Sequence, residues 1–208
     1  MSVLEEITAQ VFSGEHLSVG DLVQQALDQG LSPKEVLEQG VVAAMAQVGQ
    51  RWEAGEFYLP EVLKASRAAQ AGLKVLSPHL SKDADLTKSK VVLGTIQGDM
   101  HDIGKKLVGM VLEGAGFTVI DLGIDVDPQK FVDAVKEHEA RIIAVSALLT
   151  TTMINIIELI KRLKEAGIRD QVKIMVGGAP LTTEFAEKAG ADAYGKDCFA
   201  AVALAEKF

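Results

Sequence analysis

The most constraining feature of this sequence is a change of hydrophobic periodicity between residues 80 and 91. Before this point, apolar residues recur three and four apart, as they do on one face of a helix. After it, short runs rich in Val and Ile alternate with helical stretches. Residues 81–90 are polar and aperiodic, which is typical of a linker between separately packed domains. The sequence therefore predicts a helical domain at 1–80, a linker at 81–90 and a second domain at 91–208.

The first domain is expected to be a four-helix bundle with short connections. Its clearest signal is Ser32-Pro33-Lys34-Glu35, where a Ser N-cap, a Pro in the first helical position and a capping-box Glu begin the third helix. Gly30 ends the helix before it, and the third helix runs to about Gly55. A fourth helix is expected from Pro60 to about Leu76.

The second domain is expected to be a Rossmann-like, flavodoxin-like α/β domain. Its β-prone runs are 91–96, 118–121, 142–146, 173–176 and a weak 192–194. The helical stretches between and after them are 104–115, 128–138, 153–166, 182–189 and 197–207. Five strands alternating with helices predict a parallel sheet covered on both faces, with strand order 2-1-3-4-5. In that order a ligand binds where the first and third strands end.

Polar and glycine-rich loops follow three of these strands: 97–104, 146–152 and 177–180. Because the carboxyl ends of parallel strands meet at one edge, we expect the loops to form one site. His101 stands between Asp99 and Asp102 in the first loop, and an imidazole held by a carboxylate is the usual arrangement of a metal ligand or a base. The two glycines after the fourth strand would let backbone approach a ligand closely.

Composition and motifs exclude several classes of function. A formal charge of −8, from 21 basic and 29 acidic residues, argues against nucleic acid as a partner. There is neither a run of roughly 18 apolar residues nor a basic start before an apolar stretch, so we expect no membrane partner and a cytoplasmic protein. Cys198 is the single cysteine, which leaves no disulfide or thiolate cluster. With no HxH or HExxH spacing, a metal at His101 must bring most of its own ligands, as a macrocycle does.

Other chemistries of this fold find less support in the loops. Ser146 lacks the GxSxG elbow of a serine nucleophile, and a phosphoacceptor domain needs Asp where Ser146 stands. GxGxxG is absent after the first strand, which argues against dinucleotide binding. A flavodoxin-like flavin site stays open as an alternative at this point.

The loop residues resemble a known family. Asp99-x-His101-x-x-Gly104, followed by Ser146-x-Leu148 and Gly177-Gly178, is similar to the cobalamin-binding signature of methionine synthase, several mutases and the corrinoid proteins of methyltransferase systems. Residues 51–61 resemble the helical cap of the methionine synthase class, which mutases lack. A cap and a cobalamin domain together most resemble the corrinoid methyl-carrier subunits that serve separate methyltransferases.

This resemblance implies cobalamin bound base-off, with its own benzimidazole removed from cobalt and His101 as the metal ligand below it. Asp99 would orient His101 and Thr152 would continue the proton relay, so that these three residues take the catalytic roles. Ser146, Leu148 and Thr150 would line the slot for the displaced base. The full set of implied cofactor-binding residues is Gly98, Asp99, Met100, His101, Asp102, Ile103, Gly104, Ser146, Leu148, Thr150, Gly177, Gly178, Trp52 and Leu59, of which Trp52 and Leu59 would cover the upper face of the corrin.

The function that the resemblance implies is that of a methyl carrier with no catalysis of its own. Cobalt, as methylcobalamin in the loaded state, would pass a methyl group from a substrate:corrinoid methyltransferase to a second methyltransferase acting on tetrahydrofolate or a thiol, with a reductive activase as a further partner. Methoxylated aromatics (an O-demethylase system), methanol, methylamines and betaines are the candidate donors. The alternative is a cobalamin-dependent sensor or storage protein. Light-responsive sensors have Glu-His where this chain has Val62 and Leu63.

Overall fold

The structure is a computed structural model, and it describes residues 1–80 and 88–208. It divides into two compact units, Met1–Lys88 with Glu113–Phe117, and Ser89–Leu112 with Thr118–Phe208. Of the linker expected at 81–90, residues 81–87 lie outside the described residues, and residues 88–90 begin the first strand. These three residues are polar and exposed, so they carry no apolar signal of a strand.

The first unit is helical, as its periodicity predicts. Its elements are α1 (Val3–Ser13), α2 (His16–Asp28), α3 (Pro33–Glu35), the π-helical segment η1 (Val36–Val42), α4 (Ala43–Glu53) and α5 (Leu59–Leu80). Ser32 caps α3 by accepting the backbone N–H of Glu35 at 3.1 Å, and the reciprocal capping box occurs at Ser2 and Glu5 of α1. The third expected helix is thus continuous through α3, η1 and α4, with a π-helical stretch that sequence periodicity did not signal.

The second half of the chain forms the sheet. Its strands are β1 (Lys88–Thr95), β2 (Phe117–Asp121), β3 (Ile142–Ser146), β4 (Lys173–Gly177) and β5 (Ala193–Tyr194). Its helices are α6 (Ile103–Gly114), α7 (Pro128–His138), α8 (Asn155–Glu165), the short 3-10 helix η2 (Arg169–Gln171), α9 (Thr183–Ala189) and α10 (Cys198–Ala205). Among the described residues the strand order is β2-β1-β3-β4-β5, which confirms the predicted order.

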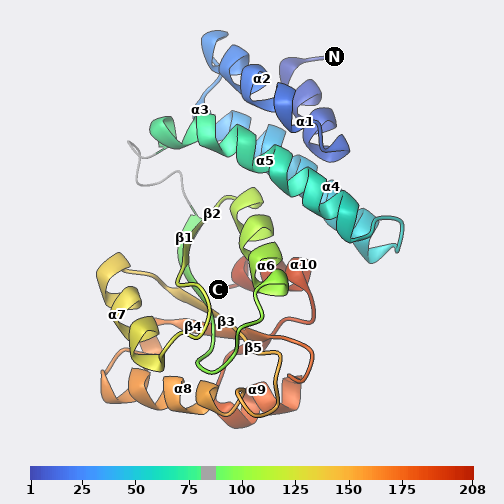
Figure 1. Ribbon diagram of the computed structural model, residues 1–208. Coiled ribbons are helices and arrows are strands. Elements are labelled where there is room, and N and C mark those ends of the chain that lie inside the picture. The colour runs from blue at the N-terminus through green and yellow to red at the C-terminus, as the bar shows by residue number, and fades with distance from the viewer. Residues whose placement is uncertain (81–87) are drawn as a thin grey trace. The chain divides into compact units, whose positions relative to one another are not determined.

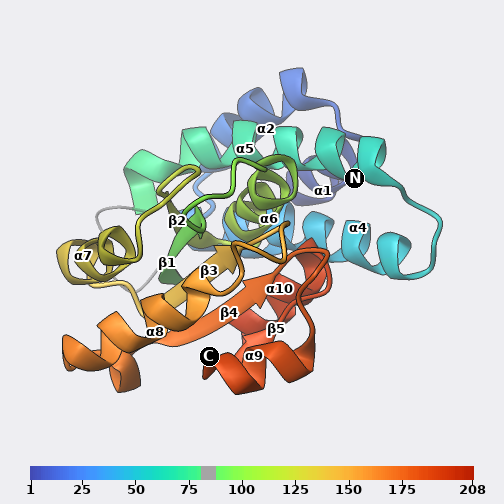
Figure 2. The same cartoon turned by 60° about the horizontal axis from the view of Figure 1, so that its bottom comes forward.

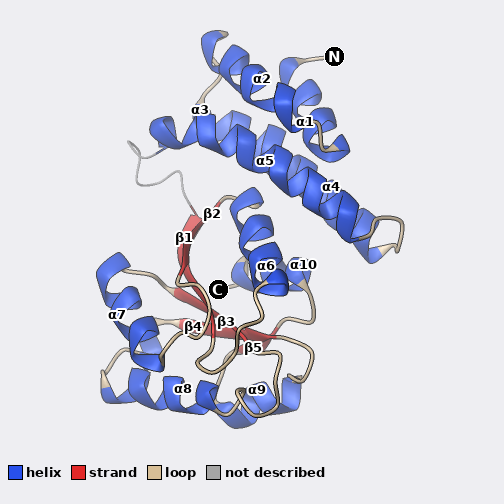
Figure 3. Ribbon diagram, viewed as in Figure 1, coloured by secondary structure: helices blue, strands red, loops and turns tan. Residues whose placement is uncertain are grey.

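Helices cover both faces of this sheet, also as predicted (Figures 1 and 3). The helices α7, α8 and α9 pack on one face, where Phe131, Ile143 and Leu159 are fully buried in the main core. The helices α6 and α10 lie on the other face, and the turned view in Figure 2 shows the same arrangement. Within the described ranges, no helix combines the length and the apolar character that crossing a bilayer requires.

Candidate functional site

Three neighbouring strands of the sheet end together at one edge. Thr95 at the end of β1 is in register with Ser146 at the end of β3, and Ser146 is in register with Gly177 at the end of β4. The loops that follow these strands therefore begin side by side, because parallel strands in register end at the same edge. All of the candidate residues between Gly98 and Gly178 lie in these loops, at the strand ends beside them, or in the first turn of α6.

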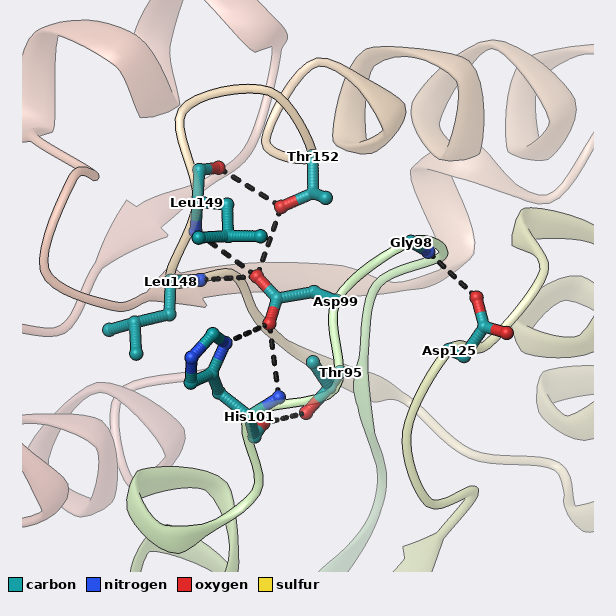
Figure 4. A network of polar contacts seen from close by, with 8 residues as sticks. All are labelled: Thr95, Gly98, Asp99, His101, Asp125, Leu148, Leu149 and Thr152. Atoms are coloured by element: carbon teal, nitrogen blue, oxygen red, sulfur yellow. Dashed lines mark hydrogen bonds and ion pairs between the residues drawn. The ribbon is translucent and has the colours of Figure 1, made fainter.

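A buried carboxylate organises the first two loops (Figure 4). Asp99 is completely buried. Its Oδ1 lies 2.7 Å from His101 Nδ1 and accepts the backbone N–H of His101 at 3.1 Å. Its Oδ2 accepts the backbone N–H groups of Leu148 at 2.7 Å and Leu149 at 3.1 Å, together with the hydroxyl of Thr152 at 3.0 Å. One side chain thus joins the loop after β1 to the loop after β3.

These contacts fix the charge of Asp99. Burial by itself raises the pKa of a carboxyl group, but here the hydrogen bonds outweigh burial. The backbone of Leu148, the ring and backbone of His101 and the hydroxyl of Thr152 together hold the pKa of Asp99 well below its ordinary value of 3.8. The carboxylate is therefore ionised at neutral pH, and the proton between it and the imidazole belongs to His101 Nδ1.

The second nitrogen of His101 is available to a ligand. The side chain is 50% exposed, and among the described residues no hydrogen bond to Nε2 is found. Within the same residues, no group of three or more His, Cys, Asp or Glu could hold a metal ion. An imidazole whose Nδ1 is held by a carboxylate and whose Nε2 is accessible fits a metal whose other ligands arrive with it.

Two polar side chains that the sequence did not single out, one of them fully buried, support this loop. The hydroxyl of Thr95 donates to the carbonyl of His101 at 2.9 Å, and Thr95 is fully buried. A threonine at the end of an otherwise apolar strand was the available signal. The side-chain amide of Asn155 donates to the carbonyl of Gln97 at 3.0 Å. The loop is therefore held by side chains from β1 and α8.

Asp102, the second carboxylate beside His101, takes a different partner. It forms an ion pair with Lys106 one helical turn further on, and this hydrogen bond lowers the pKa of Asp102. The neighbouring Lys105 is buried and paired with Asp121 at the end of β2. Of the two carboxylates that flank His101 in the sequence, only Asp99 holds the imidazole.

The glycines and hydroxyls of the other loops have distinct surroundings. Gly178 has φ +135°, and a Cβ built there would lie 1.9 Å from the carbonyl oxygen of Ala147. Backbone packing alone therefore requires glycine at this position. A Cβ at Gly177 would lie 3.0 Å from the carbonyl oxygen of Gly195, whereas one at Gly104 would meet nothing within 4 Å. Ser146 is half-buried beside Gly177, and Thr150 is exposed.

Large apolar side chains are exposed around His101. Met100 is 64% exposed, Ile103 76% and Leu148 41%. Exposed apolar side chains that gather around one polar group are typical of a binding surface. Together with the free imidazole nitrogen, they suit a broad apolar ligand that carries its own metal.

Trp52 and Leu59, the candidates in the helical unit, flank a surface turn. Trp52 is half-buried in α4, and Leu59 is the first residue of α5 and 40% exposed. Glu61 accepts the backbone N–H of Tyr58 at 3.0 Å, and the ring of Phe57 packs against Phe12 with centroids 5.0 Å apart. The turn is thus held by the side chains of Glu61 and Phe57 and by an exposed ion pair between Arg51 and Glu56.

Cys198, the single cysteine, stands apart from these groups. It is buried at the start of α10, and burial raises the pKa of its thiol to about 12. A thiol with such a pKa stays protonated and unreactive at neutral pH.

Comparison with known proteins agrees with this geometry. Family models described as B12 binding domains match residues 89–203 and residues 3–77. The chain is 49% identical to the trimethylamine corrinoid protein of Methanosarcina barkeri over 185 residues, 88% of this chain and 85% of the relative. It is 42% identical to a dimethylamine corrinoid protein of Methanosarcina mazei, over 99% of this chain and 95% of the relative.

Solved structures with the same fold are also cobalamin proteins by name. A chain of the methanol:cobalamin methyltransferase complex of Methanosarcina barkeri superposes with a TM-score of 0.87 at 28% identity, covering 99% of this chain and 78% of that one. A cobalamin-binding protein of Desulfitobacterium hafniense gives a TM-score of 0.81 at 29% identity, covering 98% and 97%.

The fold and the loops at its sheet edge therefore define a cobalamin-binding protein, and the flavin alternative is set aside. Within that class, the chain belongs to the family of corrinoid proteins that carry methyl groups in methyltransferase systems.

Proposed function

We propose that this protein receives a methyl group from a methyltransferase acting on a methylated amine and delivers it to a second methyltransferase. The bound cobalamin supplies the cobalt that accepts and releases the methyl group. Support for the amine comes from relatives named trimethylamine and dimethylamine corrinoid proteins, at 49% and 42% identity. The sensor or storage alternative is not favoured, because these relatives are named for amine substrates.

In this proposal His101 would hold the cobalt through Nε2. The observation that carries it is the 2.7 Å contact between His101 Nδ1 and the buried Asp99, which leaves Nε2 as the one ring nitrogen for a metal. Ser146 and Gly177, which lie side by side at the strand ends, would accommodate the cofactor's own base. Leu148, Thr150 and Gly178 belong to the same proposed slot.

The proposed role of Asp99 is to control how strongly His101 binds. A carboxylate that accepts the Nδ1 proton increases the electron density of the ring and so strengthens its bond to a metal. Because Thr152 donates to the other carboxylate oxygen at 3.0 Å, its hydroxyl keeps the carboxylate in this orientation and continues the hydrogen-bonded relay. Binding and release of His101 are thereby linked to the position of one proton.

We assign Trp52 and Leu59 the proposed role of shielding the reactive face of the cofactor. Both flank the turn between α4 and α5, and both present apolar surface, since Trp52 is half-buried and Leu59 is 40% exposed. Apolar cover keeps water away from a strong nucleophile.

The test of His101 is spectroscopic. The full chain is incubated with hydroxocobalamin, passed through gel filtration and compared with His101→Ala and with His16→Ala, which changes an exposed histidine at the start of α2. We expect a retained corrin band in all three proteins and an altered spectrum only in His101→Ala, since only this variant lacks the proposed nitrogen ligand. A spectrum unaltered in His101→Ala would refute the ligand assignment.

The donor is tested with the cofactor-loaded, reduced protein. It is mixed with the trimethylamine methyltransferase or the methanol methyltransferase of Methanosarcina barkeri and the matching donor, and methylation is followed by absorbance. We expect turnover with the amine enzyme at least about tenfold faster than with the methanol enzyme, a difference of about 1.4 kcal/mol. Equal rates or a preference for methanol would refute the amine proposal.

A further inference from the structure

Asp125 has an unusual backbone conformation in the loop between β2 and α7. Its φ is +52°, and Glu139 is the other non-glycine residue with positive φ among the described residues. Left-handed backbone is disfavoured for most side chains and is tolerated best by Asn and Asp after glycine. Such a conformation persists when the surrounding contacts determine it.

Two hydrogen bonds join Asp125 to the loop that carries the imidazole (Figure 4 shows the first). Asp125 Oδ1 accepts the backbone N–H of Gly98 at 2.7 Å. The backbone N–H of Asp125 donates to the carbonyl of Asp99 at 3.0 Å. The left-handed conformation lets both groups reach the same two residues, Gly98 and Asp99.

The loop around Asp125 is itself anchored to β1. The carbonyl of Gly123 accepts the N–H of Thr95 at 3.0 Å, and the N–H of Val126 donates to the carbonyl of Thr95 at 3.0 Å. Val126 also forms a parallel bridge with Ile96 and is buried. Asp125 thus lies between Gly123 and Val126, which are both hydrogen-bonded to the end of β1.

We propose that Asp125 is a positioning residue for His101: it fixes the backbone of Gly98 and Asp99, and thereby the direction of the Asp99 carboxylate that holds the imidazole. Its effect on cobalt ligation rests on the proposed function of His101. The effect of Asp125 on the position of Asp99 does not depend on that proposed function, and it can be measured without the cofactor.

Three substitutions separate the hydrogen bond from the backbone conformation. Asp125→Asn keeps an acceptor oxygen and tolerates positive φ. Asp125→Gly removes the acceptor but favours the same backbone. Asp125→Ala removes the acceptor and also disfavours the left-handed backbone conformation. Glu139→Gly is the matched control, because Glu139 has φ +54° at the end of α7 and is exposed there.

The first readout is amide hydrogen exchange of the full-length apoprotein. The informative amides are those of His101 and Leu148, which donate to opposite oxygens of Asp99. We expect both to exchange at least about tenfold faster in Asp125→Gly, as expected for loosened bonds to a charged acceptor, with a larger increase in Asp125→Ala. Wild-type rates are expected in Asp125→Asn and Glu139→Gly.

Two results would overturn the proposal. Unchanged exchange at His101 and Leu148 in Asp125→Gly would mean that Asp125 does not hold Asp99. An equal increase at these amides and at the buried Leu159 of α8 would mean general loss of stability instead of local positioning.

The second readout is the absorption spectrum with hydroxocobalamin. We expect Asp125→Gly to shift the spectrum toward that of His101→Ala, and Asp125→Asn to restore the wild-type spectrum. If His101→Ala itself matches wild type, the proposed ligand fails while the exchange data still decide on Asp125. If His101→Ala differs from wild type and Asp125→Gly does not, the positioning of the ligand by Asp125 is refuted.

Discussion

The loop after β1, which carries the proposed metal ligand His101, and the turn between α4 and α5, which Trp52 and Leu59 flank, are built in different ways. Asp99 in the first is completely buried and accepts hydrogen bonds from four residues. In the second, Tyr58 is 67% exposed and Leu59 is 40% exposed. The side chain of a metal ligand must be fixed in one orientation, whereas side chains that shield a cofactor only have to expose apolar surface. Orientation of a ligand therefore calls for a buried polar network, and shielding does not.

The strongest test of this contrast is Asp99→Ala. It leaves the N–H groups of Leu148 and Leu149 without their acceptor inside the protein, and we expect the free energy of unfolding to fall by about 4 kcal/mol. Denaturant unfolding of the apoprotein measures this. Asp102→Ala, which removes a partly exposed ion pair with Lys106, is the control and should unfold near the wild-type midpoint. Equal midpoints for the two variants would show that the hydrogen bonds of Asp99 contribute no more to stability than the ion pair of Asp102.

A second large effect is expected at Gly178. Alanine there would place its Cβ 1.9 Å from the carbonyl oxygen of Ala147 at φ +135°, so Gly178→Ala should lower the free energy of unfolding by about 3 kcal/mol. Gly104→Ala is the matched control, since its Cβ meets nothing within 4 Å in the first turn of α6. We expect that variant to gain up to about 1 kcal/mol. Thermal or denaturant unfolding measures both variants. Wild-type stability in Gly178→Ala would show that the backbone of this loop can move to accommodate the Cβ.

The pH dependence of stability is a smaller effect with a definite sign. Because the pKa of Asp99 is below 3.8 in the folded protein, the ionised carboxylate stabilises the fold above this value, and the contribution is lost as pH falls below it. The difference in stability between wild type and Asp99→Asn should therefore shrink below pH 3.8 by at most about 1.4 kcal/mol per pH unit. Urea unfolding between pH 3 and pH 6 measures it. A constant difference over this range would contradict the assigned ionisation.

The smallest effect on stability is expected in the turn of the helical unit. Leu59→Ala removes a side chain that is already 40% exposed, so the free energy of unfolding should change by less than about 1 kcal/mol. With reduced cobalamin bound to the same variant, external oxidants should oxidise the cofactor faster than they do in wild type. The rate of oxidation is measured by absorbance. Leu17→Ala, at a leucine 84% exposed in α2, is the control for a general surface change. Identical oxidation rates in all three proteins would refute the shielding role.

Much of the fold follows from local signals. Strand β3 at Ile142–Ser146 and helix α7 at Pro128–His138 have the bounds that the sequence predicts. In α7, Asp127 is an N-cap before a proline in the first helical position, and these signals act over a few residues. The start of β1 and the π-helical turn at Val36–Val42 differ from expectation, because pairing and packing with distant segments determine them.

Local sequence patterns specified the alternation of strands and helices, and with it the sheet edge at which the loops meet. The sequence also put His101 beside two carboxylates without distinguishing them, and resemblance to a family favoured Asp99. The three-dimensional packing shows that Asp99 is buried against a loop 49 residues away and that Asp125, 27 residues from Gly98, is hydrogen-bonded to the backbone of Gly98 and Asp99. The physical reason is that periodicity and caps act between near neighbours in the chain, whereas a buried hydrogen bond depends on where separate segments meet in space.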